Sequence, residues 1–131
     1  MTTISYPNPL LLIDGNWRPA STGRTEPVVN PANGQAIGHF AFASRDDLED
    51  AALAVQKGFD AWRRVSAFDR YKLMRKAAGL LRDRADAIAP LMTLEQGKVL
   101  AEARAEILAG ADTIDWFAEE ARRTYGRIVP A

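Results

Sequence analysis

The sequence predicts a mostly α fold with short N-terminal β-hairpin strands, and three observations support this. Five of the seven prolines and four of the nine glycines precede Ser44, among short apolar runs. After Ser44 the apolar residues recur at helical spacing. The 131 residues, 47% hydrophobic and 26% charged, have the composition of one globular domain. We therefore expect strands and turns in residues 1–43 and four helices in residues 44–126.

The N-terminal part contains three candidate extended segments. The apolar run Leu10–Ile13 is followed by Asp14-Gly15, a dipeptide that readily adopts the positive φ angles of a tight hairpin turn. Val28-Val29 is a second segment, closed by the turn residues 30–34. Residues 36–43 form the third segment.

The first two helices have similar start signals. Ser44 precedes Asp47 by three residues, as in a capping box, and Ser66 precedes Asp69 in the same way. Each helix then carries an apolar stripe at helical spacing. The stripe of the first helix is Leu48, Ala52, Val55, Phe59 and Trp62, and that of the second is Leu73, Ala77, Leu80 and Leu81.

Two further helices follow. The third is expected from about Asp86 to Gln96, with Gly97 as its C-terminal cap and Pro90 tolerated only within the first turn. The fourth is expected from about Leu100 to Thr124, with Gly126 as its stop. Its apolar stripe is Leu100, Ala103, Ile107, Ala111, Ile114, Phe117 and Ala121.

Composition excludes several classes of function. The chain has no Cys and one His, which excludes disulfides, a thiolate nucleophile and Cys-based metal sites. Its formal net charge of +0 predicts no general attraction to nucleic acid or to an anionic membrane. No apolar run approaches the roughly 20 residues of a membrane span, and we expect no signal peptide. A cytoplasmic protein is therefore expected.

The polar side chains do not form a recognisable catalytic motif. His39 lies in an expected strand without a second His or Cys, so a structural role is the better interpretation. Glu102 and Glu106 are four residues apart on one helix face, where a water-facing pair is the default. Because the sequence contains neither GxGxxG nor GxxxxGK[ST], we assign no catalytic and no cofactor-binding residue to this chain.

The order of short motifs along nearly the whole chain resembles the N-terminal segment of the aldehyde dehydrogenase superfamily, most closely its succinate-semialdehyde dehydrogenase branch. Each motif is weak alone, but all occur in register. The matching segments are Leu12–Trp17, Val29–Gly34, Ala61–Arg63, Arg70, Met92–Lys98, Leu100–Glu106 and Trp116–Gly126.

This resemblance implies that residues 1–131 are a truncated part of the α/β aldehyde dehydrogenase fold. The implied activity is oxidation of an aldehyde, succinate semialdehyde among them, to the acid with NAD or NADP. The family's catalytic cysteine, general-base glutamate, nicotinamide-receiving loop and oxyanion-hole asparagine lie beyond the end of this sequence. The isolated chain is therefore expected to bind no dinucleotide and to be inactive.

The resemblance also implies two sets of site residues. In relatives with a monovalent cation, the backbone before the Asn-Pro turn and the acid of the Glu-x-Gly-Lys motif contribute ligands. These positions are Val28, Val29 and Glu95 here. The fourth helix lines the approach to the substrate tunnel in relatives, which places Glu106, Gly110 and Phe117 near the substrate channel of a longer enzyme.

A second hypothesis is a free-standing helical protein-interaction module, or a decayed remnant without catalysis. The apolar stripes suit helix-on-helix packing. If no sheet covers them, they leave an apolar patch and favour self-association. The expected partner is then the remainder of the enzyme or a second copy, rather than nucleic acid or a membrane.

Overall fold

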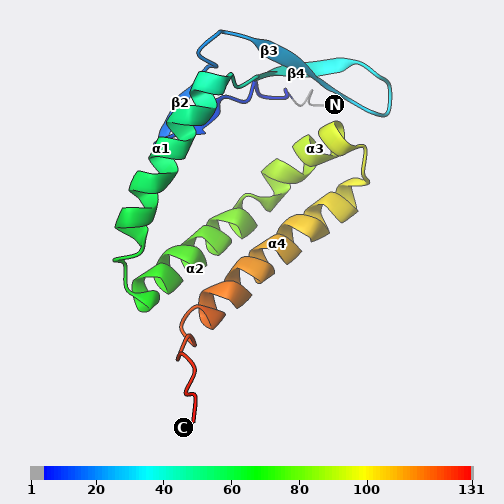
Figure 1. The fold of residues 1–131 in the computed structure, drawn as a ribbon. Helices are drawn as coiled ribbons and strands as arrows, with labels where there is room; N and C mark the ends of the chain where they lie inside the picture. Colours follow the sequence, from blue (N-terminus) through cyan, green and yellow to red (C-terminus); the bar gives the residue numbers. More distant parts are fainter. Residues whose placement is uncertain (1–4, 131) are drawn as a thin grey trace.

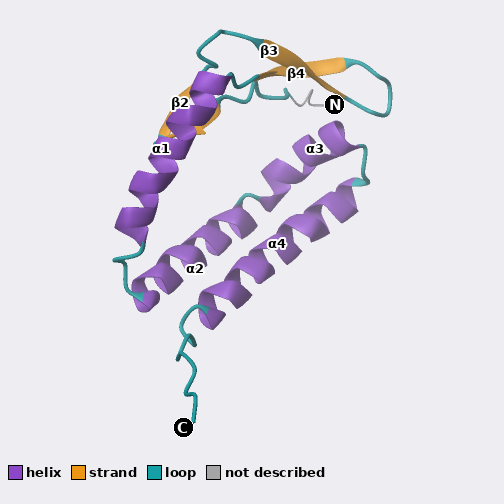
Figure 2. Ribbon diagram, viewed as in Figure 1, coloured by secondary structure: helices purple, strands orange, loops and turns teal. Residues whose placement is uncertain are grey.

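The computed structural model describes residues 5–130, in which one pair of strands lies across the end of the helices and the other lies beside the first helix (Figure 1). The first four residues and Ala131 of the predicted segment lie outside this part. The strands are β1 (Leu11–Ile13), β2 (Asn16–Arg18), β3 (Thr25–Val29) and β4 (Ala36–Ala41). The helices are α1 (Arg45–Trp62), α2 (Ala67–Asp83), α3 (Ala85–Gln96) and α4 (Leu100–Glu120). The predicted fold class is confirmed (Figure 2).

The strands pair as two antiparallel hairpins, β1 with β2 and β3 with β4. Asp14 and Gly15 have φ angles of 49° and 79°, which confirms the predicted tight turn between β1 and β2. In the second hairpin Val28 pairs with Gly38, and the register shifts between Val28 and Val29. This irregularity is a β-bulge on β4, where Ile37 is the extra residue opposite the end of β3.

Helix α1 begins as its sequence predicts but buries a different face. Ser44 is the N-cap, and both hydrogen bonds of the capping box with Asp47 are present. The predicted apolar stripe is exposed, with Leu48 at 68% and Val55 at 70%. Figure 1 shows α1 diverging from α2, and α1 packs chiefly against β1. An apolar stripe on α1 is thus left without cover among the described residues.

The core is a seam of small side chains where α4 packs against α2 and α3. Its centre consists of Ala85, Ala89, Ala103 and Ile107, with Leu81, Ile88, Met92 and Leu108 packed around it. The stripe predicted for α2 is therefore wrong by about one position, because Ala78 is buried while Leu73 is 53% exposed. On α4, Ala103, Ile107 and Ala111 are buried as predicted, but Phe117 is 58% exposed and Ala118 is buried in its place. Alanines face the seam because they let the helices approach closely.

Two predicted helix details are wrong. Pro90 lies in the second turn of α3, since the helix starts at Ala85. Because proline has no backbone N–H, α3 lacks one hydrogen bond from Pro90 to the preceding turn. Helix α4 ends at Glu120 rather than Thr124. There the amides of Arg122 and Arg123 bond to carbonyls three residues back, which tightens the chain into a turn.

The described fold exposes more surface than a compact protein of its mass. The accessible surface of the chain is 9915 Å². A compact monomer of 14.4 kDa would expose about 6,800 Å². Among the described helices, none combines the length and hydropathy that a membrane span requires. The surplus surface includes the apolar stripe of α1.

Candidate functional site

The three residues expected to serve a cation lie at two neighbouring places. Val28 and Val29 end β3 opposite the bulge of β4, and Val28 is buried while Val29 is 46% exposed. Glu95 lies in the last turn of α3. The turn after β3 reaches this end of the helix, because a side chain at Gly97 would come within 2.9 Å of Pro31 Cγ.

A tyrosine that the sequence did not single out holds the Glu95 carboxylate. The Tyr6 hydroxyl donates a hydrogen bond to Glu95 Oε2 at 2.7 Å. Desolvation, together with this bond and the charge of Glu95, raises the pKa of Tyr6 to about 12. This contact joins residues 89 positions apart, so no local sequence pattern predicts it.

The chemistry of the donor set, backbone carbonyls and one carboxylate, suits a hard cation. However, one oxygen of that carboxylate accepts the Tyr6 hydroxyl. In residues 5–130 no group of three or more His, Asp or Glu side chains is placed to hold a metal ion. A cation site at Val28, Val29 and Glu95 therefore stays a prediction from the resemblance.

The three residues expected beside a substrate channel share one face of α4. Glu106, Gly110 and Phe117 are spaced by four and seven residues, so they project within about 40° of one another around the helix. This face adjoins the buried one, and Phe117 is 58% exposed. Glu106 forms an ion pair with Lys98 just before the helix. The structure thus brings these residues together on an open surface.

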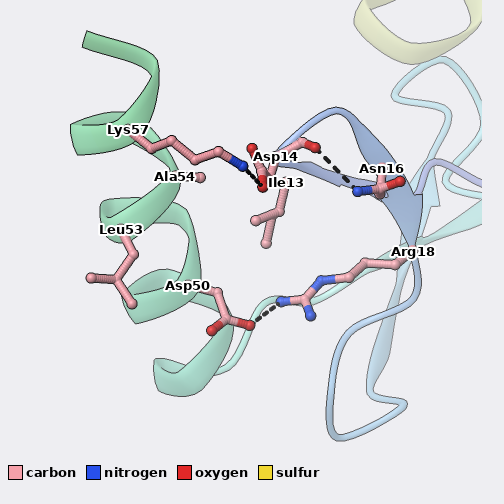
Figure 3. Close-up of a pocket in the computed structure, with 8 residues that line it drawn as sticks. All are labelled: Ile13, Asp14, Asn16, Arg18, Asp50, Leu53, Ala54 and Lys57. Atoms are coloured by element: carbon pink, nitrogen blue, oxygen red, sulfur yellow. Dashed lines mark hydrogen bonds and ion pairs between the residues drawn. The ribbon is translucent and has the colours of Figure 1, made fainter. Parts of the chain in front are cut away.

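A groove of about 340 Å³ lies between the first hairpin and α1 (Figure 3). Two ion pairs cross it: Arg18 with Asp50 at 2.9 Å, and Lys57 with Asp14 at 2.8 Å. The rest of the lining consists of Ile13, Asn16, Leu53 and Ala54. Each of these four charges is paired with an opposite one. The ion pairs therefore hold the hairpin against α1 and leave none of the four charges unpaired to bind a ligand.

Next to this groove, Asp47 is 1% exposed and accepts several hydrogen bonds. Its carboxylate accepts from the Arg18 guanidinium at 2.9 Å and from the backbone amides of Ser21 and Ser44. The bond from the Ser44 amide is the largest of the effects that lower the pKa of Asp47 to about 2, against the opposing effect of burial. The sequence predicted that Asp47 takes part in the capping box, but it did not predict the hydrogen bond from Arg18.

The carboxylates at the expected sites are paired with other side chains of this chain. Since the chain has no Cys, aldehyde chemistry through a thiohemiacetal has no nucleophile here. The carboxylates nearest the expected sites, Glu95 and Glu106, are engaged by Tyr6 and Lys98.

Comparison with known proteins identifies the family of this chain. Residues 17–131 match the profile of the aldehyde dehydrogenase family. The chain is 47% identical over 131 residues to 4-(hydroxymethyl)benzenesulfonate dehydrogenase of Comamonas testosteroni, covering 100% of this chain and 28% of that protein. It is 42% identical over 119 residues to the NADP(+) succinate-semialdehyde dehydrogenase GabD of Escherichia coli (strain K12), covering 91% and 25%.

Solved structures share the fold. The crystal structure of an E. coli NADP dependent enzyme aligns with a TM-score of 0.90 and 40% identity, covering 95% of this chain and 26% of that one. An NAD-dependent aldehyde dehydrogenase from Sinorhizobium meliloti aligns with a TM-score of 0.89 and 37% identity, covering 93% and 25%. The chain spans about a quarter of the length of these relatives. It belongs to the aldehyde dehydrogenase family and corresponds to the N-terminal part of such enzymes.

Proposed function

We propose that this chain is the N-terminal part of an NAD(P)-dependent aldehyde dehydrogenase whose substrate carries an acid group away from the reacting carbon. The observation that carries the proposal is the family match over residues 17–131. The acid group is inferred from relatives named for succinate, glutarate and aspartate semialdehydes, 3-sulfolactaldehyde and a benzenesulfonate. Each of these compounds bears a carboxylate or a sulfonate.

In this proposal the chain contributes support rather than the reacting groups. The exposed face of α4 with Glu106, Gly110 and Phe117 forms one wall of the substrate entrance. Val28, Val29 and Glu95 contribute to a monovalent cation site that other segments complete. With no glycine-rich phosphate loop and no Cys in the sequence, we derive no step through the dinucleotide from these residues. The cytoplasmic location expected from the sequence remains part of the proposal.

A chimeric enzyme tests this function. The matching first quarter of E. coli GabD would be replaced by this chain, and reduction of NADP⁺ would be followed with succinate semialdehyde. We expect the chimera to oxidise the aldehyde, because the two segments are 42% identical. A control chimera with Ala111→Pro should lose activity, since proline breaks α4 at its buried seam.

The proposal fails if the chimera folds, as judged by circular dichroism and by the same oligomer size as GabD, yet oxidises no aldehyde. The 131-residue chain alone should reduce neither NAD⁺ nor NADP⁺ with any aldehyde. Activity of the chain alone, free of other polypeptides, would refute the supporting role.

The second candidate, a module that associates with itself or a partner, is favoured by one observation. Along α1 the side chains of Val55 and Phe59 are 70% and 55% exposed. Sedimentation of the chain tests this candidate, since an apolar stripe of this kind drives association. A concentration-dependent increase in mass that Val55→Lys abolishes would support it. A monomer at all concentrations would exclude self-association.

A further inference from the structure

The N-terminal residues Ser5–Pro9, here called the strap, run along the outer edge of β4. The His39 amide donates to Asn8 Oδ1 at 2.9 Å, and the Ala41 amide donates to the Pro9 carbonyl at 2.9 Å. The Phe42 amide instead donates toward the β3 side, to the Arg24 carbonyl at 2.9 Å. Two amides of β4 therefore depend on the strap, while a neighbouring amide does not.

Tyr6 is the residue of the strap that reaches the helices. Its ring lies against Gly38, where an added Cβ would come within 2.9 Å of Tyr6 Cδ1 and 3.2 Å of the Pro7 carbonyl oxygen. Its hydroxyl lies beyond the hairpin and donates a hydrogen bond to Glu95 Oε2 at 2.7 Å. Because Gly38 has no side chain, the Tyr6 ring can lie close to β4 while its hydroxyl reaches Glu95 on α3.

Few other contacts connect this hairpin to the helical layer. Packing between the β3–β4 hairpin and α3 is sparse among the described residues. The approach of Pro31 to Gly97 is a second, apolar contact at the same end of α3. A hydrogen bond to an ionised carboxylate is stronger than one between neutral groups. Tyr6 thus makes the polar connection in a region with little packing.

We propose that the strap is a latch that fixes the β3–β4 hairpin to the end of α3, with Tyr6 as the residue that closes it. In the closed state Tyr6 occupies the Glu95 carboxylate and the strap shields the outer edge of β4. In the open state the carboxylate is free and the His39 and Ala41 amides lose their partners. The latch does not depend on the proposed enzymatic activity.

Hydrogen exchange of individual amides in the full chain tests the latch. Rates for His39, Ala41 and Phe42 would be measured by NMR in the unmodified chain, Tyr6→Phe and Glu95→Gln. We expect exchange at His39 and Ala41 to rise about tenfold in both variants, with Phe42 unchanged. Gly38→Ala should also raise these rates, because its methyl group would meet both the Tyr6 ring and Asn8 Oδ1, the acceptor of the His39 amide. The control is Tyr125→Phe, because Tyr125 is 88% exposed.

A double variant, Tyr6→Phe with Glu95→Gln, should exchange no faster than either single variant, since both remove one interaction. Unchanged rates at His39 and Ala41 in both single variants would overturn the proposal. An equal rise at all three amides would also overturn it, because that result reports loosening of the whole hairpin. The chimera described above can succeed or fail in either case, so the two proposals are tested separately.

Discussion

The guanidinium of Arg18 and the carboxylate of Asp47 lie 2.9 Å apart, and this pair connects the end of β2 to the first turn of α1. Asp47 is buried, whereas the Arg18 side chain is about one-third exposed. The same guanidinium nitrogen reaches Asp50 at 2.9 Å. One arginine shared by two acids thus joins the first hairpin to α1, beside the Lys57–Asp14 ion pair.

Removing one partner of this pair should destabilise the chain. Arg18→Gln leaves the buried Asp47 carboxylate without its cation, so we expect a fall in Tm of about 5 °C or more. Arg45→Gln is the control, because its partner Glu49 is exposed and such surface pairs contribute little. Thermal unfolding followed by circular dichroism measures both. Equal Tm values for the two variants would show that the Asp47 pair does not stabilise the fold.

Asp47 should make stability depend on acid pH. Its pKa is about 2 in the folded chain, against an ordinary value of 3.8. The unfolded chain therefore binds its proton first as pH falls, so the stabilisation is present above about pH 4 and is lost as pH approaches 2. Denaturant midpoints between pH 6 and pH 2 should fall less steeply in Asp47→Asn. Parallel profiles for the two proteins would contradict this assignment.

The small-residue seam should be sensitive to truncation. Ile107 is 5% exposed in the core cluster, and Ile107→Ala is expected to cost about 2–4 kcal/mol of unfolding free energy. Leu53→Ala on α1 is the matched control, because Leu53 is 73% exposed and should change stability by less than about 0.5 kcal/mol. Urea unfolding distinguishes the two. A similar loss in both variants would mean that Leu53 is covered in solution.

Two glycines should respond in opposite ways to alanine. Gly97 has a φ of 75° and lies against Pro31, so Gly97→Ala should destabilise the chain by about 1–2 kcal/mol. Gly58 lies inside α1 with open space around it, so Gly58→Ala should stabilise by about 0.5–1 kcal/mol. Both changes can be measured by urea unfolding. Stabilisation by Gly97→Ala would contradict the described end of α3.

Features set by neighbouring residues could be predicted from the sequence. The turn at Asp14-Gly15 and the capping box at Ser44 depend on a few consecutive residues, and both are confirmed. Burial was harder to predict: Ala103 and Ala111 are buried as expected, but Leu73 is exposed and Ala78 is buried instead. Periodicity locates an apolar face only to within about one position when small residues adjoin large ones.

The contacts around the candidate sites were harder to predict from the sequence than burial was. Arg18 meets Asp47 across 29 positions, and Tyr6 meets Glu95 across 89. No spacing rule links residues so far apart, so these partners emerge only from the folded chain. The family resemblance supplied Glu95 and Glu106 as residues of interest, while the structure supplied Tyr6 and Lys98 as their partners.

The separation of Tyr6 from Glu95 has a consequence for the order of folding. Closing a loop of 89 residues costs more entropy than pairing α3 with α4, which are joined by a short connection. Local helical pairs form quickly, whereas contacts between distant segments wait for the chain ends to meet. The strap, Ser5–Pro9, should therefore take its place last, after the helices have assembled. It should also be the first to leave when the protein is warmed.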